Sequence, residues 1–516
     1  MQCPPSLFLR SFLGTRSFFS IPQANKEAQG RAISSIASYV RDAAYFFVVA
    51  PPAKHEQGGD VRDWRGWSLR GWCRLEFLAN ALSSGRDGKQ KPLIVVESPS
   101  AIYTHGPGGI VNKEWINNPV GLGNFTVQDD AELLGPVIQR LVGSGMAAAK
   151  AAGQGHLHRV LYVSRRRLLC GTGYDASEPS LDEWMAEMGF ASVHDGKDSG
   201  LTPLFYSVLG GQVEIALALI QRGADVQSKL RDAHPFLGRN KGCTILHTAC
   251  RMSDSVELLQ GLLRAGANAK ATQQTSQNCL AEAVQAGHLK VVDALMAHDP
   301  SLADHVGFSG NWPFSYVGTE ATLAHALKTY PELMQRSMTR IHMNRPWCGN
   351  TLLLESTLMS DAGMVRAILE AGHDPNYYSR PGGARLRGFW GFMCRFSGLL
   401  ASIGVRSDLT EMFAYSTRAT PLHGAVVNGN LFAVEILLEY GADPCSTCHP
   451  IRMMPHMLAA KLGHRDIVFA LLRAGAPATA KDSRGRTAAV WARRRKHAEL
   501  AAEIENYVDV LRSPSM

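Results

Sequence analysis

The stretch Thr420-Pro421-Leu422-His423-Gly424-Ala425 decides the fold, because its spacing to later glycines recurs along the chain. Gly429 follows Thr420 by nine residues and Gly441 follows it by 21, with Ala442-Asp443 directly after. A threonine can cap a helix start, and a proline at the first helical position loses no useful N–H group. A glycine suits a helix end that needs a positive φ. The stretch therefore predicts two helices and a loop.

The same frame recurs through the C-terminal three-fifths of the chain with a period near 33 residues. Its starting residues are Thr202, Thr244, Asn278, Thr351, Thr420, Met454 and Thr487. The gap of 73 residues before Thr351 leaves room for one further repeat, in which Trp312 takes the threonine position. The other long gaps predict a short insertion at 231–241 and a long one at 379–416. One such unit cannot bury its apolar face alone, so the units must stack.

This Thr-Pro-Leu-His pattern resembles the ankyrin repeat. The resemblance covers residues 198–511 and implies an all-α solenoid of about seven repeats plus a cap. The basic run at 493–496 fits such a cap, whose outer face must be polar, and it can also be interpreted as a nuclear signal or a phosphate-binding patch. The family implies an interaction scaffold or adaptor that binds a protein partner. By position at a hairpin tip, Asn376, Tyr377 and Tyr378 are the candidate partner-binding residues.

Residues 18–170 are predicted to form an α/β domain, preceded by a separate segment at 1–17 and followed by a linker at 171–197. Apolar runs at 45–50, 92–96 and 160–163 indicate buried strands, and helices are expected over 24–44, 71–82 and 129–145, the last opened by a capping box at 129–132. Continuous apolar strands that alternate with helices argue for a parallel sheet.

The stretch Trp72-Cys73-Arg74-Leu75-Glu76 resembles the Trp-Cys-x-x-Glu segment of Toll/interleukin-receptor (TIR) domains. The first strand and helix of that family would lie upstream of residue 17, so the resemblance implies a TIR-like domain whose completeness stays open. In many TIR domains this glutamate supports cleavage of the nicotinamide–ribose bond of NAD, where a carboxylate faces an oxocarbenium-like centre. The resemblance thus implies Glu76 as a catalytic carboxylate, in an NAD hydrolase regulated by the repeats.

The alternative for Glu76 is a surface helix glutamate that pairs with a nearby arginine, and we favour a binding protein over an enzyme. The arrangement of the whole chain also resembles ankyrin-repeat proteins of dinoflagellate algae. That resemblance implies the architecture and no particular activity.

Composition excludes several protein classes. The 516 residues are 45% hydrophobic and 19% charged, which is ordinary for a globular protein. Without a long uncharged apolar run, no spanning helix is expected. The net charge of +8 is mild for this length, and nucleic-acid binding would need a basic stripe on one face. Ten widely spaced cysteines indicate reduced thiols and a cytoplasmic protein, although residues 1–20 also resemble an organellar targeting peptide.

Two further segments carry alternatives. The group Cys445-x-x-Cys448-His449, with His456, resembles half a zinc site, but it falls at a hairpin tip, and we expect neither a metal nor a cofactor. The apolar segment 388–405 of the long insertion either folds back on the repeats or contacts a partner or a membrane surface.

Overall fold

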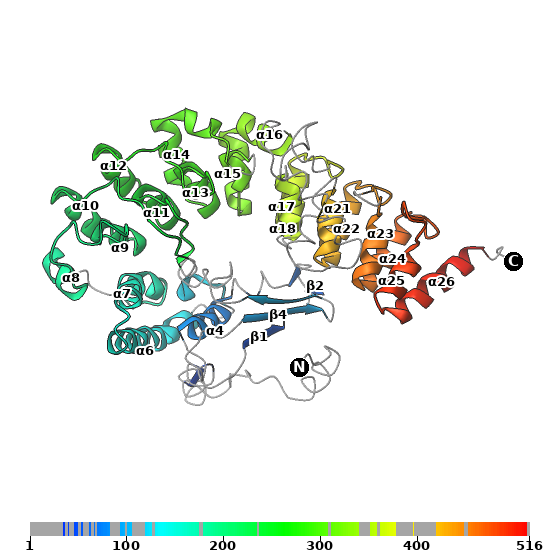
Figure 1. Cartoon of the computed structure of the whole chain (residues 1–516), viewed down its shortest axis with the longest axis horizontal. Helices are drawn as coiled ribbons and strands as arrows, with labels where there is room; N and C mark the ends of the chain where they lie inside the picture. Colours follow the sequence, from blue (N-terminus) through cyan, green and yellow to red (C-terminus); the bar gives the residue numbers. More distant parts are fainter. Residues whose placement is uncertain are drawn as a thin grey trace. The chain divides into compact units, whose positions relative to one another are not determined.

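The computed structural model describes residues 35–36, 40, 46–49, 53–54, 61–62, 67, 70–82, 93–98, 101–105, 119–125, 129–174, 179–234, 237–307, 311–339, 351–358, 362–377, 396, 419–447 and 452–512. Two compact units are present. Unit 1 consists of Met1–Ala53 and Arg62–Leu295, and unit 2 consists of Lys54–Val61 and Met296–Met516. Helices predominate in both units (Figure 1). In the part of the chain that is described, no helix has both the length and the apolar character needed to cross a membrane.

The N-terminal sheet of unit 1 is small and mixed. Strand β1 (Phe46–Val49) runs parallel to β4 (Leu93–Ser98), and β4 runs antiparallel to β5 (Ala101–His105). Strands β2 (Ala53–Lys54) and β3 (Val61–Arg62) form a separate pair. The parallel pairing predicted for the first two strands is confirmed, whereas the third strand of this sheet is a hairpin partner.

The strand predicted at 160–163 is wrong, because these residues lie inside helix α7 (Gly155–Leu169). Helix α7 packs against α6 (Asp130–Ala151) and η2 (Val120–Leu122), and also against α9 (Pro203–Leu209). Val160, Leu161 and Val163 are buried on these neighbours. Since the helix is enclosed on several sides, its apolar residues form a continuous run that periodicity cannot distinguish from a buried strand.

Two of the helices predicted in this region form as expected, with one exception in detail, and the helix predicted at 24–44 lies mostly outside the described residues. Helix α4 spans Gly71–Leu82. Helix α6 begins at Asp130, but its N-cap residue Asp129 makes no capping hydrogen bond through its side chain, so the predicted capping box is wrong.

The helical stack begins earlier than the repeat pattern predicted. Helices α7 and α8 (Leu181–Glu187) take the inner and outer positions of a unit that precedes α9 and α10 (Val213–Gln221), as Figure 1 shows. Helix α8 starts at a capping box formed by Ser180 and Glu183. The fully buried Trp184 donates from Nε1 to Oε1 of Gln212 at 2.8 Å. Part of the predicted linker is therefore a packed helix.

Unit 1 continues with two rows of helices. Inner helices α9, α11 (Ile245–Met252) and α13 (Cys279–Ala286) pack on one another in sequence order, and so do outer helices α10 and α12 (Val256–Arg264). Helix α14 (Leu289–His298) follows α13. This arrangement is the stack of helix pairs that the 33-residue period predicted.

Unit 2 repeats the arrangement. Its elements are η4 (Pro300–Asp304), η5 (Pro313–Tyr316), α15 (Glu320–Thr329), α16 (Pro331–Thr339), α17 (Leu352–Leu358), α18 (Ala362–Glu370), α21 (Pro421–Val427), α22 (Leu431–Glu439), α23 (Pro455–Leu462), α24 (Arg465–Arg473), α25 (Ala488–Arg494) and α26 (Ala498–Arg512). At the repeat predicted from Trp312, the inner helix is the short 3₁₀ helix η5, and Trp312 makes no capping bond through its side chain. The insertion predicted at 379–416 lies outside the described residues, apart from the exposed Phe396.

The histidine of the Thr-Pro-Leu-His step joins neighbouring repeats. His423 contacts Oγ1 of Thr420 through Nδ1 at 2.9 Å and the carbonyl oxygen of Met453, in the next repeat, through Nε2 at 3.2 Å. His247 makes the same pair of contacts at 2.7 and 3.1 Å. A carbonyl oxygen only accepts, so Nε2 donates and Nδ1 accepts in a neutral ring. Burial lowers the pKa of His423 to about 4.

This buried histidine makes stability depend on pH. The lowered pKa means that the unfolded chain binds a proton more readily than the folded chain. The stabilisation is complete above pH 6.5 and is lost as the pH falls toward 4, by up to about 1.4 kcal/mol per pH unit. Between pH 7 and pH 5, we expect the α21 amides of His423→Gln to lose less protection against hydrogen exchange than those of the wild type. Hydrogen exchange of the α21 amides, corrected for intrinsic rates, measures this, and equal losses in the two proteins would contradict it.

The stacking of α7 on α9 depends on a glycine. A Cβ atom on Gly210 would lie 2.6 Å from the carbonyl oxygen of Val163, whereas one on Gly143, in α6, would meet nothing within 4 Å. We expect Gly210→Ala to lower the free energy of unfolding by about 1–3 kcal/mol through overpacking. Gly143→Ala should raise it by about 0.5–1 kcal/mol, because alanine favours a helix interior. Thermal unfolding followed by circular dichroism measures the stability of both variants. Equal changes in the two variants would show that the stack does not need a glycine at position 210.

Candidate functional site

Four of the described loops that end helix pairs share one backbone arrangement. An aspartate or asparagine two residues after the helix-end glycine accepts a hydrogen bond from the amide two residues further on, at 2.8 or 2.9 Å. The accepting residues are Asp225, Asn268, Asp374 and Asp443. Such turns are what short Asp and Asn side chains favour. The helix-end glycine and the Asp or Asn two residues later thus build four tips with the same turn.

Neighbouring tips are also bonded to each other. In unit 2, Nδ2 of Asn376 donates to the carbonyl oxygen of Gly441 at 2.9 Å, and Oδ1 of Asn376 accepts from the amide of Asp443 at 2.6 Å. In unit 1, the side chain of Gln227 donates in the same way to the carbonyl oxygen of Gly266. The side chain four residues after one helix-end glycine therefore reaches the next tip, which fixes the tips as a row.

Two of the three predicted partner-binding residues lie on this row. Asn376 and Tyr377 are half-buried at the tip after α18, and Tyr378 lies outside the described residues. Tyr377 meets the ring of His373 edge-on, with ring centroids 6.4 Å apart. The Asn376 amide is occupied by the bonds between tips, a role that the sequence pattern did not reveal. Tyr377 makes no such bond and is the more available of the two.

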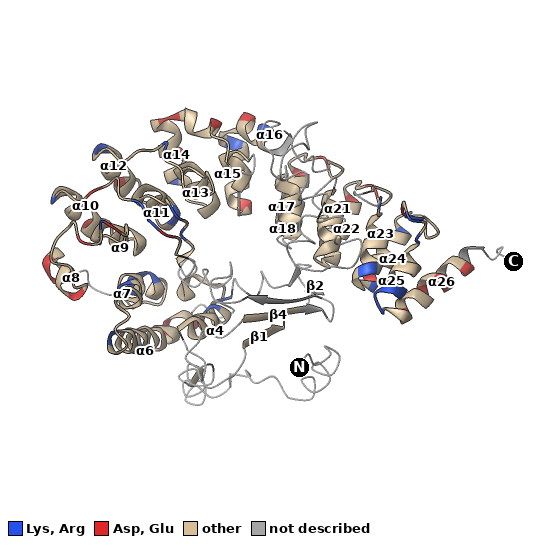
Figure 2. Ribbon diagram, in the orientation of Figure 1, with Lys and Arg blue, Asp and Glu red and all other residues tan. Residues whose placement is uncertain are grey.

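A second polar region lies on the inner helices of unit 1. Figure 2 shows Lys and Arg over α7 and α11, and Asp and Glu over α8. Within the short insertion at 231–241, the amide of His234 donates to the carbonyl oxygen of Arg239 at 2.8 Å. Arg239 is thereby placed against α13, with only 4% of its surface exposed.

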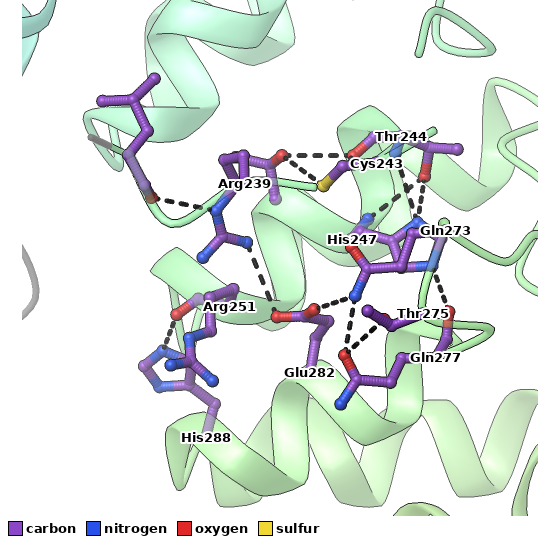
Figure 3. A network of polar contacts seen from close by, with 12 residues as sticks. Arg239, Cys243, Thr244, His247, Arg251, Gln273, Thr275, Gln277, Glu282 and His288 are labelled. Carbon is purple, nitrogen blue, oxygen red and sulfur yellow. Dashed lines mark hydrogen bonds and ion pairs between the residues drawn. The ribbon is translucent and has the colours of Figure 1, made fainter. Parts of the chain in front are cut away.

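Arg239 forms a buried ion pair. Its Nη1 atom lies 3.6 Å from Oε2 of Glu282, and Oε1 of Glu282 accepts from Nε2 of Gln273 at 2.7 Å (Figure 3). Gln273 in turn donates to Gln277 at 2.8 Å. A buried pair is tolerated when further hydrogen bonds satisfy its polar atoms, and Gln273 supplies such a bond to Oε1 of Glu282.

Two further arginines lie in the same region. Arg167 donates from Nη1 to the carbonyl oxygen of Met252, at the end of α11. Burial lowers the pKa of Arg167, and the nearby charge of Arg239 adds to that shift. His288 contacts the carbonyl oxygen of Arg251 at 3.1 Å, and its pKa is lowered chiefly by burial, with smaller contributions from Arg167 and Arg251. Arginines from α7, α11 and the insertion therefore share one electrostatic environment.

Glu76 lies on α4, away from the repeats in sequence. Neighbouring side chains fix this helix, since Trp72 donates from Nε1 to Asp130 at 3.2 Å and Arg74 donates to the carbonyl oxygen of Pro119 at 2.9 Å. Glu76 is half-buried, and burial raises the pKa of its carboxyl group to about 7. Burial, followed by the charge of Glu76, raises the pKa of Cys73 to about 12. Among the described residues, no ion pair of Glu76 with an arginine is found.

The half zinc site is only partly within the described residues. Cys445 is exposed at a tip, where its Sγ atom lies 3.9 Å from the carbonyl oxygen of Gly475, and His456 is fully buried in α23. Cys448 and His449 lie outside the described residues. Within the ranges that the structure covers, no three His, Cys, Asp or Glu side chains gather as metal ligands would.

Comparison with known proteins identifies the repeats. The ankyrin repeat family model matches residues 199–230 and 418–449, which contain α9–α10 and α21–α22. The chain is also similar to the E3 ubiquitin-protein ligase KEG of Arabidopsis thaliana, with 22% identity over 343 residues. That match covers 63% of this chain but only 20% of the relative, so the chain spans about a fifth of that protein's length. This chain therefore contains ankyrin repeats.

Proposed function

We propose that the protein is an interaction scaffold or adaptor that holds a protein partner on its ankyrin repeats. The observation that carries the proposal is the row of bonded tips, in which Asn376 links its own tip to that of Gly441. Loops held by a rigid scaffold are where binding residues concentrate. A row of loops fixed in this way loses little conformational freedom when a partner binds, which favours affinity.

Within this proposal the three predicted residues have different roles. Tyr377 is the aromatic anchor, because tyrosine is enriched among the residues that dominate interface energies. Asn376 is a positioning residue that holds the tip in place. Tyr378 extends the same anchor by its position in sequence.

The ligase activity in the relative's name is not part of the proposal, since this chain spans only a fifth of that protein. We place the protein in a reducing compartment such as the cytoplasm. The six cysteines that the described ranges contain are all free thiols, as expected where glutathione keeps thiols reduced.

Substitutions at one tip test the proposal. Partners crosslinked to the full-length protein would first be identified by mass spectrometry, and affinity would then be measured by biolayer interferometry. We expect Tyr377→Ala to weaken binding by about ten-fold or more, as the loss of an interface anchor does. Tyr507→Ala, a half-buried tyrosine of helix α26 that meets Phe469 edge-on, is the matched control and should change affinity by less than about two-fold. Equal weakening by both variants would show that the tips are not the binding surface.

The raised pKa of Glu76 favours a second candidate function, the NAD hydrolase regulated by the repeats. A carboxyl group whose pKa is strongly raised by burial is a recognised signal of a functional site. A carboxylate that stabilises an oxocarbenium-like centre must be ionised. Activity through Glu76 would therefore rise with pH across about 7.

NAD consumption by the full-length protein, followed by product chromatography, tests this candidate. We expect turnover to increase between pH 6 and pH 8 and to be abolished in Glu76→Gln. Glu132→Gln, an exposed acid on α6, should keep the wild-type rate. Product at the level of a buffer blank would leave Glu76 without a catalytic role.

A further inference from the structure

Two histidines join the short insertion to the start of helix α7. The ring of His234, in the insertion, meets the ring of His156 with centroids 5.3 Å apart and a tilt of 47°. His156 lies in the first turn of α7, and its Nδ1 atom lies 2.6 Å from the hydroxyl oxygen of Tyr206 in α9. Since Tyr206 is fully buried, the three rings tie the insertion to two inner helices. His156, Tyr206 and His234 form what we call the histidine latch.

Backbone hydrogen bonds hold the insertion beside the latch. The amide of Arg231 donates to the carbonyl oxygen of Ser199 at 3.0 Å, and the amide of His234 donates to that of Arg239 at 2.8 Å. An amide held in this way exchanges its hydrogen with solvent when the local structure opens. The two amides therefore report whether residues 231–234 are in place.

Each element of the latch adds titratable or charged groups. Helix α7 supplies His156 and, three residues later, Arg159, whose guanidinium carbon lies 5.9 Å from the centre of the Tyr206 ring. Helix α9 supplies Tyr206, and the insertion supplies His234 and the exposed Asp232. This group thus contains one permanent cation and one carboxylate beside two imidazoles.

Both imidazoles of the closed latch are neutral at pH 7. Burial, followed by the charges of His234 and Arg159, lowers the pKa of His156 to about 4. Burial also lowers the pKa of His234, and the charge of Asp232 opposes that shift. Burial raises the pKa of Tyr206 to about 12, so its hydroxyl group stays protonated. Opening the latch returns both rings to water, where they bind protons more readily.

We infer that the histidine latch is a pH-sensitive junction, which opens in acid and releases residues 231–234 from α7. In the closed latch, protonated rings of His156 and His234 would lie beside the permanent charge of Arg159, and these like charges repel. Asp232 compensates for only one of the three charges, and water screens it. The inference goes beyond the scaffold function, because it concerns one junction within unit 1 and needs no partner.

Hydrogen exchange of the full-length protein between pH 7.5 and pH 5 tests the inference, with rates corrected for intrinsic exchange. The readout is the protection of the Arg231 and His234 amides. We expect their opening equilibrium to rise as the pH falls below about 6.5, by up to about ten-fold per pH unit for each ring that takes up a proton. His156→Gln and His234→Gln should each make this rise smaller. His298→Gln, an exposed histidine at the end of α14, should leave it unchanged.

Asp232→Asn is a second test that leaves all three rings of the latch intact. The Asp232 carboxylate favours the charged form of His234 in the closed latch, so its removal should lower the pKa of that ring further. The rise in opening between pH 7.5 and pH 5 should then be larger than in the wild type. Asp232 is exposed, and circular dichroism at pH 7.5 verifies that the variants fold.

Three results would overturn the inference. They are an opening equilibrium of the wild type that does not rise in acid, an equal rise in the wild type and both histidine variants, and a smaller rise in Asp232→Asn. A histidine variant that fails to fold leaves the decision to Asp232→Asn.

Discussion

Every repeat of this protein depends on its contact with the next one. A helix pair buries only part of its apolar surface within itself, and the rest must be covered by a neighbour. The buried histidines make this contact specific as well as apolar, because one ring joins the start of its own helix to the backbone of the following repeat. A shift of register between repeats would leave Nε2 of the ring buried without its partner, which is costly. Stability and register are thus set by the same side chain.

The two sides of a repeat are then available for different purposes. Apolar contacts and histidine bonds lie between repeats, so the tips and the inner face can carry polar groups at little cost to the stack. Unit 2 uses this freedom at its tips, where Asn376 bonds neighbouring loops together. Unit 1 uses it on its inner helices, where arginines collect. The candidate binding features follow from how the stack is held together.

The sequence was most informative where a backbone position demands one residue type. The caps at Thr202 and Thr244 and the positive φ of Gly223 and Gly441 follow from the repeat pattern and are confirmed. It was least informative where burial on several sides removed the periodic signal, as in α7. A signal for the early repeat was nevertheless present. Gly189 has a positive φ and precedes Gly223 by 34 residues, but no Thr-Pro-Leu step accompanies it.

The candidate sites were harder to predict, because they depend on pairs of residues that are distant in sequence. The position of Asn376 at a tip was predictable, whereas its bond to Gly441, across the long insertion, was not. The excess of arginines over carboxylates within the inner helices of unit 1 was not predicted, because net charge averages over both rows of helices. Only the alternation of inner and outer helices separates the arginines from the carboxylates. Once the helix order is known, the division can be read directly from the sequence.

Helix α7 is shared between two layers of unit 1. It packs against α6 and η2 on the N-terminal side and against α9 of the following repeat on the other. A helix of 15 residues behaves as a stiff rod, so a displacement imposed at one end of it is carried along its length. The N-terminal layer therefore has no flexible joint to the repeats through α7. A ligand that tilted α6 would also displace the repeat that packs on α7. Strain applied to the repeats would in turn displace α6, which packs against α4.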